Sequence, residues 1–360
     1  MNNIAHIKRN SLREICRRHY LLIAIKRYPL RGILRRSFLL IVLTFHLSSF
    51  TLHAQDIHFS FLDLDPLLFN PAYSGFFDGK GRFGVIYRNQ WATVTTPFQT
   101  ISATAELSVM RSKRNQNGLS AGLWVSADRA GSLDYGSTSA SAIVSYYQAV
   151  GNGDNLVSVA IEGGIGQVGF NPENIDLTDG TETFIREKAL YPTLGAGIAW
   201  FCQHSESFYT KVGFSMRNIN EPDISYLGLS DTRLSRRWNV YARGEWRWTS
   251  QWGLLPVVGY QRQEGFNELV YGCDVKWYLN ERQRDYLALS AGLMGRHGDA
   301  LAVNLAVEWT SWIFAFSYDA NLSTLAEASH TLGAFEVGVI YRIGKKDDSH
   351  RRAALPCPII

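Results

Sequence analysis

Charged side chains recur at alternate positions of two stretches that are otherwise rich in apolar residues. They are Arg237, Arg243, Glu245 and Arg247 in the first stretch, and Asp274 and Lys276 in the second. Successive side chains of a strand point to opposite faces, so the charges of each stretch would share one face. Opposite charges there can pair, and the pattern predicts a salt-bridge network that fills a narrow barrel. The alternative is that these charges line a passage or receive a bound segment.

Other residues that could do chemistry are not arranged for catalysis. The histidines outside the first 54 residues lack the HxxxH or HExxH spacing of a helical metal site; they are His58, His204, His297, His330 and His350. No nucleophile-elbow motif accompanies the serines. Cys202, Cys273 and Cys357 are odd in number and without CxxC spacing, which argues against a disulfide framework or a structural zinc site. We therefore expect no enzyme activity, no metal and no cofactor.

The first 54 residues have the composition of a secretory signal peptide. A basic region is followed by the apolar run Ser37–Leu52 and by the small-residue exit His53-Ala54. An uncleaved anchor helix is the alternative. The segment carries 10 of the 36 basic residues and one of the 32 acidic residues, which leaves 26 and 31 and a net charge of 26 − 31 = −5. A chain with this balance is not expected to bind nucleic acid.

After residue 81 the chain alternates apolar with polar or small residues in segments of roughly ten, typical of a transmembrane β-barrel of about 14 antiparallel strands. In the segment 300–309, Leu301, Val303 and Leu305 oppose Asn304 and Glu308. The predicted strands are 82–91, 98–109, 118–127, 135–150, 155–168, 189–202, 207–218, 236–249, 252–262, 267–280, 286–295, 300–309, 312–319 and 330–343. A soluble β-sandwich also alternates, so the connections have to distinguish the two folds.

The lengths of the connections favour the barrel. Every even-numbered connection is short, as periplasmic turns are, whereas the longest connections are odd-numbered: Gly169–Lys188, Ile219–Ser235 and Ala320–Ser329. Aromatic residues gather near the even-numbered turns and predict an interfacial girdle there. They are Tyr146, Tyr147, Trp200, Phe201, Phe208, Tyr209, Trp248, Trp252, Trp277, Tyr278, Trp309 and Trp312. We therefore predict a transmembrane barrel over residues 82–343.

Two segments flank the predicted barrel. Residues 55–81 are aromatic and contain Pro66 and Pro71 but follow neither a strand nor a helix period. We expect them to pack at the periplasmic mouth or to fold into the lumen as a plug; the alternative is a docking surface for a periplasmic partner. The tail, 344–360, is charged and then apolar and is expected in the periplasm, as a second docking element or as a frayed end.

Three places in the sequence resemble the PorP/SprF family, outer-membrane proteins of the type IX secretion system of Bacteroidetes. They are Asn70-Pro71-Ala72-Tyr73-Ser74-Gly75, then Tyr87-Arg88-Asn89-Gln90-Trp91, and finally Tyr318-Asp319 with a last strand that closes in Tyr341-Arg342. The first two motifs in this order are fairly specific, and the strands between match in pattern only. The chain lacks the Arg-Phe ending associated with the family, which leaves the role of its last residues open.

The resemblance implies a non-enzymatic component of type IX secretion, a barrel located in the outer membrane and in contact with its lipid. Its expected partners are periplasmic and outer-membrane components of that system and a secreted surface protein with a C-terminal sorting domain, such as an adhesin used in gliding. The residues expected to bind partners are Asn70, Pro71, Tyr73, Gly75, Arg88, Gln90 and Trp91. The alternatives are a passive channel or small-solute transporter and an outer-membrane enzyme such as a lipase.

Overall fold

The computed structural model describes residues 57–90, 96–112, 117–130, 135–151, 154–169, 188–225, 232–281, 285–323 and 332–344. The segment predicted as a signal peptide, Trp91, and the tail after Gly344 lie outside these residues. The described strands are β1 (Gly81–Gln90), β2 (Phe98–Ser112), β3 (Asn117–Ala130), β4 (Tyr135–Val150), β5 (Asn155–Gly169), β6 (Lys188–Ser205), β7 (Phe208–Arg217), β8 (Arg237–Arg247), β9 (Trp252–Gln263), β10 (Phe266–Asn280), β11 (Leu287–Arg296), β12 (Ala300–Trp309), β13 (Trp312–Asn321) and β14 (Leu332–Ile343).

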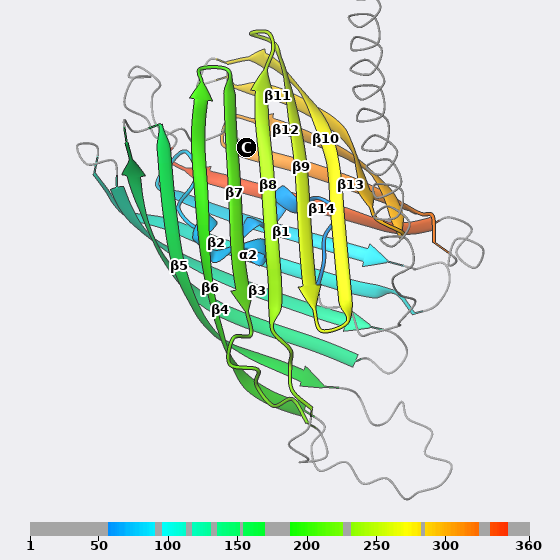
Figure 1. The fold of residues 1–360 in the computed structure, drawn as a ribbon. Coiled ribbons are helices and arrows are strands. Elements are labelled where there is room, and N and C mark those ends of the chain that lie inside the picture. The colour runs from blue at the N-terminus through cyan, green and yellow to red at the C-terminus, as the bar shows by residue number, and fades with distance from the viewer. Residues whose placement is uncertain are drawn as a thin grey trace, which may run out of the picture. The chain divides into compact units, whose positions relative to one another are not determined.

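These strands form one closed antiparallel barrel, as predicted from the sequence (Figure 1). Each strand pairs with its neighbours in the chain, and β1 closes the barrel by pairing with β14 from Gly81↔Ile343 to Gln90↔Ala334. The alternation of the sequence becomes the two faces of the wall. In β12 the outward residues Leu301, Val303 and Leu305 are exposed, whereas Asn304 and Glu308 point inward and are buried. An apolar outer face and a polar inner face are what a barrel needs in a membrane.

Three predicted strands end three residues too early: β3, which continues to Ala130 instead of ending at residue 127, and two strands that contain a β-bulge. Strand β2 continues to Ser112 instead of ending at residue 109, and β6 continues to Ser205 instead of ending at residue 202. The pairing register shifts between Ser108 and Met110 in β2 and between Gln203 and Ser205 in β6. A bulge inserts a residue that breaks the period of two, so the sequence pattern stops although the strand does not.

The connections assign the two ends of the barrel. Residues 206–207 and 310–311 are the shortest even-numbered connections, whereas 170–187 and 218–236 are the longest odd-numbered ones. We call the end with the even-numbered connections the periplasmic end and the other the external end, as in bacterial barrels generally. The odd-numbered connections 264–265 and 297–299 are also short, so the long loops are confined to part of the external end.

The predicted aromatic girdle is correct for eight of its twelve residues and wrong for four. Outward rings near the even-numbered turns include Trp200, Trp252, Trp277, Trp309 and Trp312, all substantially exposed. The four exceptions are buried and point into the barrel: Tyr147, Phe201, Tyr209 and Tyr278. Each follows or precedes an outward aromatic residue directly, and neighbours in a strand face opposite sides.

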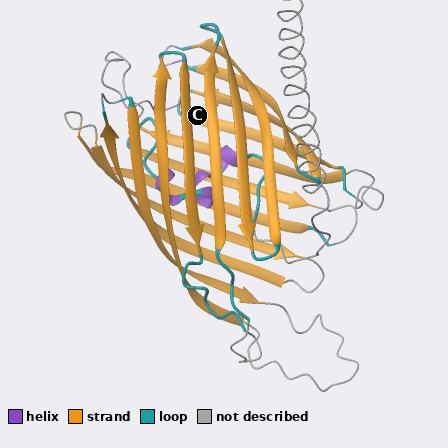
Figure 2. Ribbon diagram, viewed as in Figure 1, coloured by secondary structure: helices purple, strands orange, loops and turns teal. Residues whose placement is uncertain are grey.

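Residues 57–80 form a plug inside the barrel, so the structure decides between the two positions that the sequence left open. The plug contains three short helical turns, η1 (Leu62–Leu64), α2 (Pro66–Phe69) and η2 (Pro71–Tyr73), drawn in purple within the barrel in Figure 2. Its side chains are almost all buried, and with inward residues of the wall they form the main hydrophobic core. Among the described residues, none of the helices has the length and apolarity to cross a membrane.

Candidate functional site: the anchorage of the plug

The turn η2 forms because Asn70 and Pro71 suit the start of a helix. Asn70 precedes it, and the Asn70 side-chain oxygen accepts a hydrogen bond from the Ala72 backbone N–H at 2.8 Å. Pro71 occupies the first helical position, where its missing N–H needs no partner and its fixed φ already suits the helix. The sequence Asn-Pro therefore creates a rigid turn in a segment that has no hydrophobic period.

The same Asn70 side chain binds the turn to the wall. Its amide nitrogen donates to the backbone carbonyls of Ile198 on β6 and Phe214 on β7, at 2.9 and 3.2 Å. The wall admits this contact because Gly197 has no side chain. A Cβ atom at Gly197 would lie 2.0 Å from the Asn70 side-chain oxygen. The glycine thus makes the hollow that the asparagine fills.

Tyr73 and Gly75 fix the other side of the turn. The Tyr73 ring packs edge-on against Phe201 and Tyr241, with centroids 5.9 and 5.6 Å apart, an arrangement that aromatic pairs favour. Gly75 has a φ of +83°, and a Cβ there would lie 1.7 Å from the Ser120 Oγ, so only glycine fits. The Gly75 N–H donates to Glu106 at 3.2 Å.

The amino end of the plug is held by a cluster of charges near the external ends of the strands. Arg88 of β1 lies at its centre and forms ion pairs with Glu336 of β14 and with Asp319 of β13, the latter at 2.9 Å. The backbone N–H groups of Ser60 and Phe61 donate to the two Glu336 oxygens at 2.7 and 2.9 Å. The second and third places of the family resemblance therefore meet around the plug.

Two aspartates, Asp63 and Asp65, bind the middle part of the plug to the wall. Asp63 forms ion pairs with Lys211 and Arg243 and accepts the Tyr241 hydroxyl hydrogen bond at 2.5 Å. Asp65 accepts hydrogen bonds from the Ser102 hydroxyl at 2.5 Å and the Trp124 indole at 2.9 Å. A buried carboxylate needs partners of this kind, because an unpaired one costs several kcal/mol.

At the periplasmic end the plug leads directly into the wall. Arg111 of β2 donates to the carbonyl oxygens of Gly75 and Phe77 at 3.2 and 3.3 Å. The Lys80 N–H donates to the Ile343 carbonyl at 2.7 Å, and the chain continues as β1. The plug is thus bonded to the wall near the external end, in its middle and at the periplasmic end.

Six of the seven residues expected to bind partners are described, and all six are buried: Asn70, Pro71, Tyr73, Gly75, Arg88 and Gln90. The Gln90 side-chain oxygen accepts hydrogen bonds from Nε and Nη2 of Arg88, at 3.4 and 3.3 Å. Trp91 lies outside the described residues. The contacts that the structure gives these six residues are with the chain itself, and their binding of a partner stays a prediction.

The six charges from which the sequence argument started all face the lumen in β8 and β10, but at different heights. Arg237 donates to the Ile57 carbonyl at 3.1 Å near the external end. Lys276 pairs with Glu308, and Arg243 lies 3.7 Å from Asp274 as well as on Asp63. Glu245 accepts from Tyr278 at 2.6 Å, and Arg247 pairs with Glu281 at 2.6 Å near the periplasmic end. Most of the network joins strand to strand, and only part of it reaches the plug.

Sequence reasoning missed the plug's own anchoring residues, above all Asp63 and Asp65. Their signal was present: two acidic residues stand in a run of leucine and phenylalanine, FSFLDLDPLLF, where buried charges would require partners. The glycines opposite Asn70 and Tyr73, Gly197 and Gly213, were also missed. A Cβ at Gly213 would lie 2.4 Å from the Tyr73 hydroxyl. Their lack of side chains is meaningful only once the plug is placed.

Comparisons with known proteins agree with the sequence resemblance. The family model "Type IX secretion system membrane protein PorP/SprF" matches residues 51–341. No curated protein matches the chain. Among solved structures, the toluene transporter TbuX of Ralstonia pickettii is 10% identical, with a TM-score of 0.49, and the match covers 79% of this chain and 94% of that one. The toluene transporter TodX of Pseudomonas putida is 9% identical, with a TM-score of 0.46 and coverages of 77% and 92%.

A FadL homologue of Pseudomonas aeruginosa is 10% identical, with a TM-score of 0.40 and coverages of 76% and 92%. At these identities and scores the similarity to solved structures carries no functional conclusion. Among the described residues, no group of three histidine, cysteine or acidic side chains is placed to hold a metal ion.

The family model covers well over half of the chain, and its description agrees with the barrel. The chain is a member of the PorP/SprF family, an outer-membrane β-barrel component of the type IX secretion system.

Proposed function

We propose that this protein is a non-conducting, non-enzymatic barrel that retains a secreted protein at the cell surface. The retained protein would carry a C-terminal sorting domain, as an adhesin used in gliding does. The observation that carries the proposal is the anchorage of the plug. Bonds near the external end, in the middle and at the periplasmic end fix a segment that lies inside the lumen.

A plug bonded to the wall at three levels favours retention of a protein over transport of a solute. Passage of a solute would require the plug to leave the lumen, and several buried ion pairs between plug and wall would then be broken. Breaking one buried pair by removing a partner costs about 3–5 kcal/mol. Moving the plug would separate Asp63 from Lys211 and Arg243, and would take the amides of Ser60 and Phe61 from Glu336. A rigid barrel is instead a suitable platform for loops that bind a protein.

The external connection between β7 and β8 is the best-described candidate for holding the secreted protein. The backbones of its two arms pair as an isolated antiparallel β-bridge between Asp223 and Arg233. The Ile224 N–H also donates a hydrogen bond to the Thr232 carbonyl, at 2.9 Å. Ile224 and Leu234 pack on Val168, Ala189 and Tyr191 of β5 and β6. The base of this loop is therefore fixed to the wall. Residues 226–231 between the arms, and the connection 170–187, lie outside the described residues.

The proposal is tested by exchanging loops. Replacing residues 226–231 and 170–187 by those of a paralogue is expected to release the surface protein into the medium, while the barrel still reaches the outer membrane. The control exchanges residues 324–331, another external connection, and should leave retention unchanged. Cell-surface and medium fractions are compared by immunoblot. Unchanged retention after the first exchange contradicts the assignment to these loops.

A second experiment tests the class of function. The tagged protein is isolated from native outer membrane in mild detergent, and its partners are identified by mass spectrometry. We expect type IX components and a surface protein with a C-terminal sorting domain. A barrel that comes without such partners and conducts ions in a planar bilayer would instead support the channel.

A further inference from the structure

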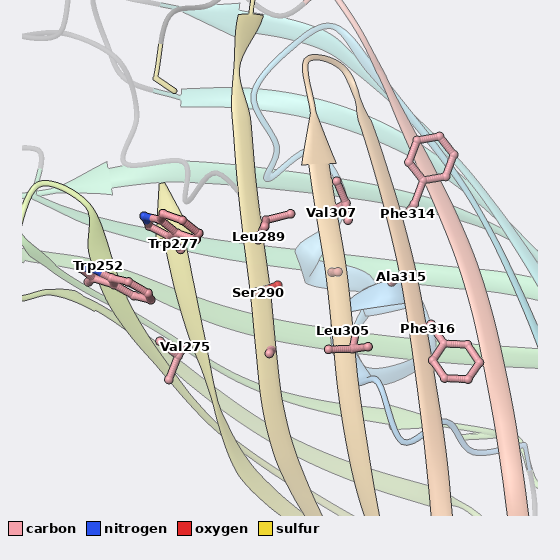
Figure 3. A pocket seen from close by; sticks show the side chains of 12 residues that line it. Trp252, Val275, Trp277, Leu289, Ser290, Leu305, Val307, Phe314, Ala315 and Phe316 are labelled. Carbon is pink, nitrogen blue, oxygen red and sulfur yellow. The ribbon is translucent and has the colours of Figure 1, made fainter. Parts of the chain in front are cut away.

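A hollow of about 570 Å³ lies on the outward face of the barrel, away from the plug (Figure 3). Its lining comes from five consecutive strands, β9 to β13, and is almost wholly apolar. The outward residues among them are exposed in the isolated chain: Trp252, Val275, Trp277, Leu305, Val307, Phe314 and Phe316. Because this face of the wall meets lipid, the hollow is open to membrane components and not to water.

The strand register explains why the wall is hollow here. One row of paired residues runs across the strands as Trp252, Trp277, Leu289, Val307 and Phe314, and the next row as Val275, Ala291, Leu305 and Phe316. The first row therefore has large rings at both ends, whereas the second begins at Val275 and ends at the ring of Phe316. The side chains between them are short and aliphatic. Figure 3 shows the two tryptophans on one side and the two phenylalanines on the other.

The dimensions and the depth of the hollow suit one hydrocarbon chain. Trp277 on β10 and Phe314 on β13 are three strand spacings apart, about 14 Å at about 4.8 Å each, so the space between their rings, over β11 and β12, has room for one chain. The first row lies next to the outward rings of Trp309 and Trp312, near the periplasmic end. Tryptophan at this depth marks the level of the lipid head groups.

We propose that the hollow is a binding site for one acyl chain of a phospholipid in the periplasmic leaflet. The chain lies between the Trp252–Trp277 pair, whose rings are stacked 5.4 Å apart and nearly parallel, and the rings of Phe314 and Phe316. The acyl chain contacts the aliphatic side chains of β11 and β12 beneath it and the aromatic rings on its two sides. A lipid against a flat part of the barrel has contacts on one side only. The additional dispersion contacts hold this lipid longer than its neighbours.

The test fills the hollow. Ala291 lies in the middle of the second row, and Ala291→Trp places a large ring where the acyl chain would lie. The matched control is Ala142→Trp on β4, where the alanine is also outward and exposed but does not line the hollow. The proteins are purified in mild detergent, and bound phospholipid is measured by native mass spectrometry. Slower migration after heating on a gel shows that each barrel is folded.

We expect wild type and Ala142→Trp to retain a phospholipid that Ala291→Trp loses. Equal retention by Ala291→Trp, or no retained lipid in wild type, overturns the proposal. If the retained species is an acylated protein and not a phospholipid, the assignment of the occupant is wrong. Should Ala291→Trp not fold, Ala291→Phe and the measurement on wild type decide the question.

Discussion

At the scale of the residue, Asn70 uses its oxygen to cap the turn η2 and its nitrogen to bind two wall carbonyls. Asn70→Ala should lower the free energy of unfolding by about 2–4 kcal/mol, because it removes the cap and both hydrogen bonds from the plug to the wall. Asn155→Ala, which removes only an exposed bond from Trp200, should cost less than about 1.5 kcal/mol. Urea unfolding in lipid vesicles measures both. Equal losses would contradict the role assigned to Asn70.

Arg88 gives the second prediction at this scale. Its side chain is 2% exposed and neutralises both Asp319 and Glu336, so Arg88→Ala leaves two buried carboxylates with fewer partners. The expected loss in the free energy of unfolding is about 3–5 kcal/mol. The exposed pair Arg236–Glu221 provides the comparison, and Arg236→Ala should change stability by about 0–1 kcal/mol. A loss at Arg88 as small as at Arg236 would show that the cluster is dispensable.

At the scale of the element, the plug should act as a fixed part of the barrel. A Cβ at Gly122 of β3 would lie 3.0 Å from the Ser74 Oγ, within the reach of a disulfide. In a background without Cys16, Cys202, Cys273 and Cys357, the oxidised double variant Ser74→Cys/Gly122→Cys should retain surface protein as well as the unlinked background does. Retention that is lost on oxidation and restored by a reductant would show that the plug must move. Ser74→Cys alone controls for the substitution.

At the scale of the whole molecule, the plug runs from the external end to the periplasmic end. Its residue His58 lies near Arg296, the last residue of β11, with 3.3 Å between the two side-chain nitrogens. Lys80, at the other end of the plug, is exposed and hydrogen-bonds to Ile343, the last residue of β14. The amino end of the plug is therefore expected to face the cell exterior, although β1 begins at the periplasmic end.

This direction is tested with a membrane-impermeant maleimide in the cysteine-free background. On intact cells, His58→Cys should be labelled and Lys80→Cys should not, whereas after permeabilisation both should be labelled. Labelling of Lys80→Cys alone on intact cells would reverse the orientation of the barrel. An unlabelled His58→Cys would show that the external mouth is covered.

The sequence alone determined the wall of this barrel. A strand that separates lipid from a polar lumen must alternate with a period of two, so β12 and its neighbours can be read directly from residues such as Leu301 and Asn304. The motifs around Asn70 and Arg88 indicated the family, and the charges of β8 and β10 were placed on the inner face for the same periodic reason. The pattern ended too early at the bulges of β2 and β6, and also in β3 and β13.

The tertiary structure alone decided where the plug lies and what the motifs contact. Residues 57–80 have no period, because each of their side chains meets a different part of a curved wall. Their partners lie far away in sequence: Ser60 binds Glu336, and Asn70 binds the carbonyls of Ile198 and Phe214. The closure of the barrel brings these groups together, and no local pattern records such distances. The sequence therefore specifies the wall strand by strand, whereas the anchorage exists only once the barrel has closed around the plug.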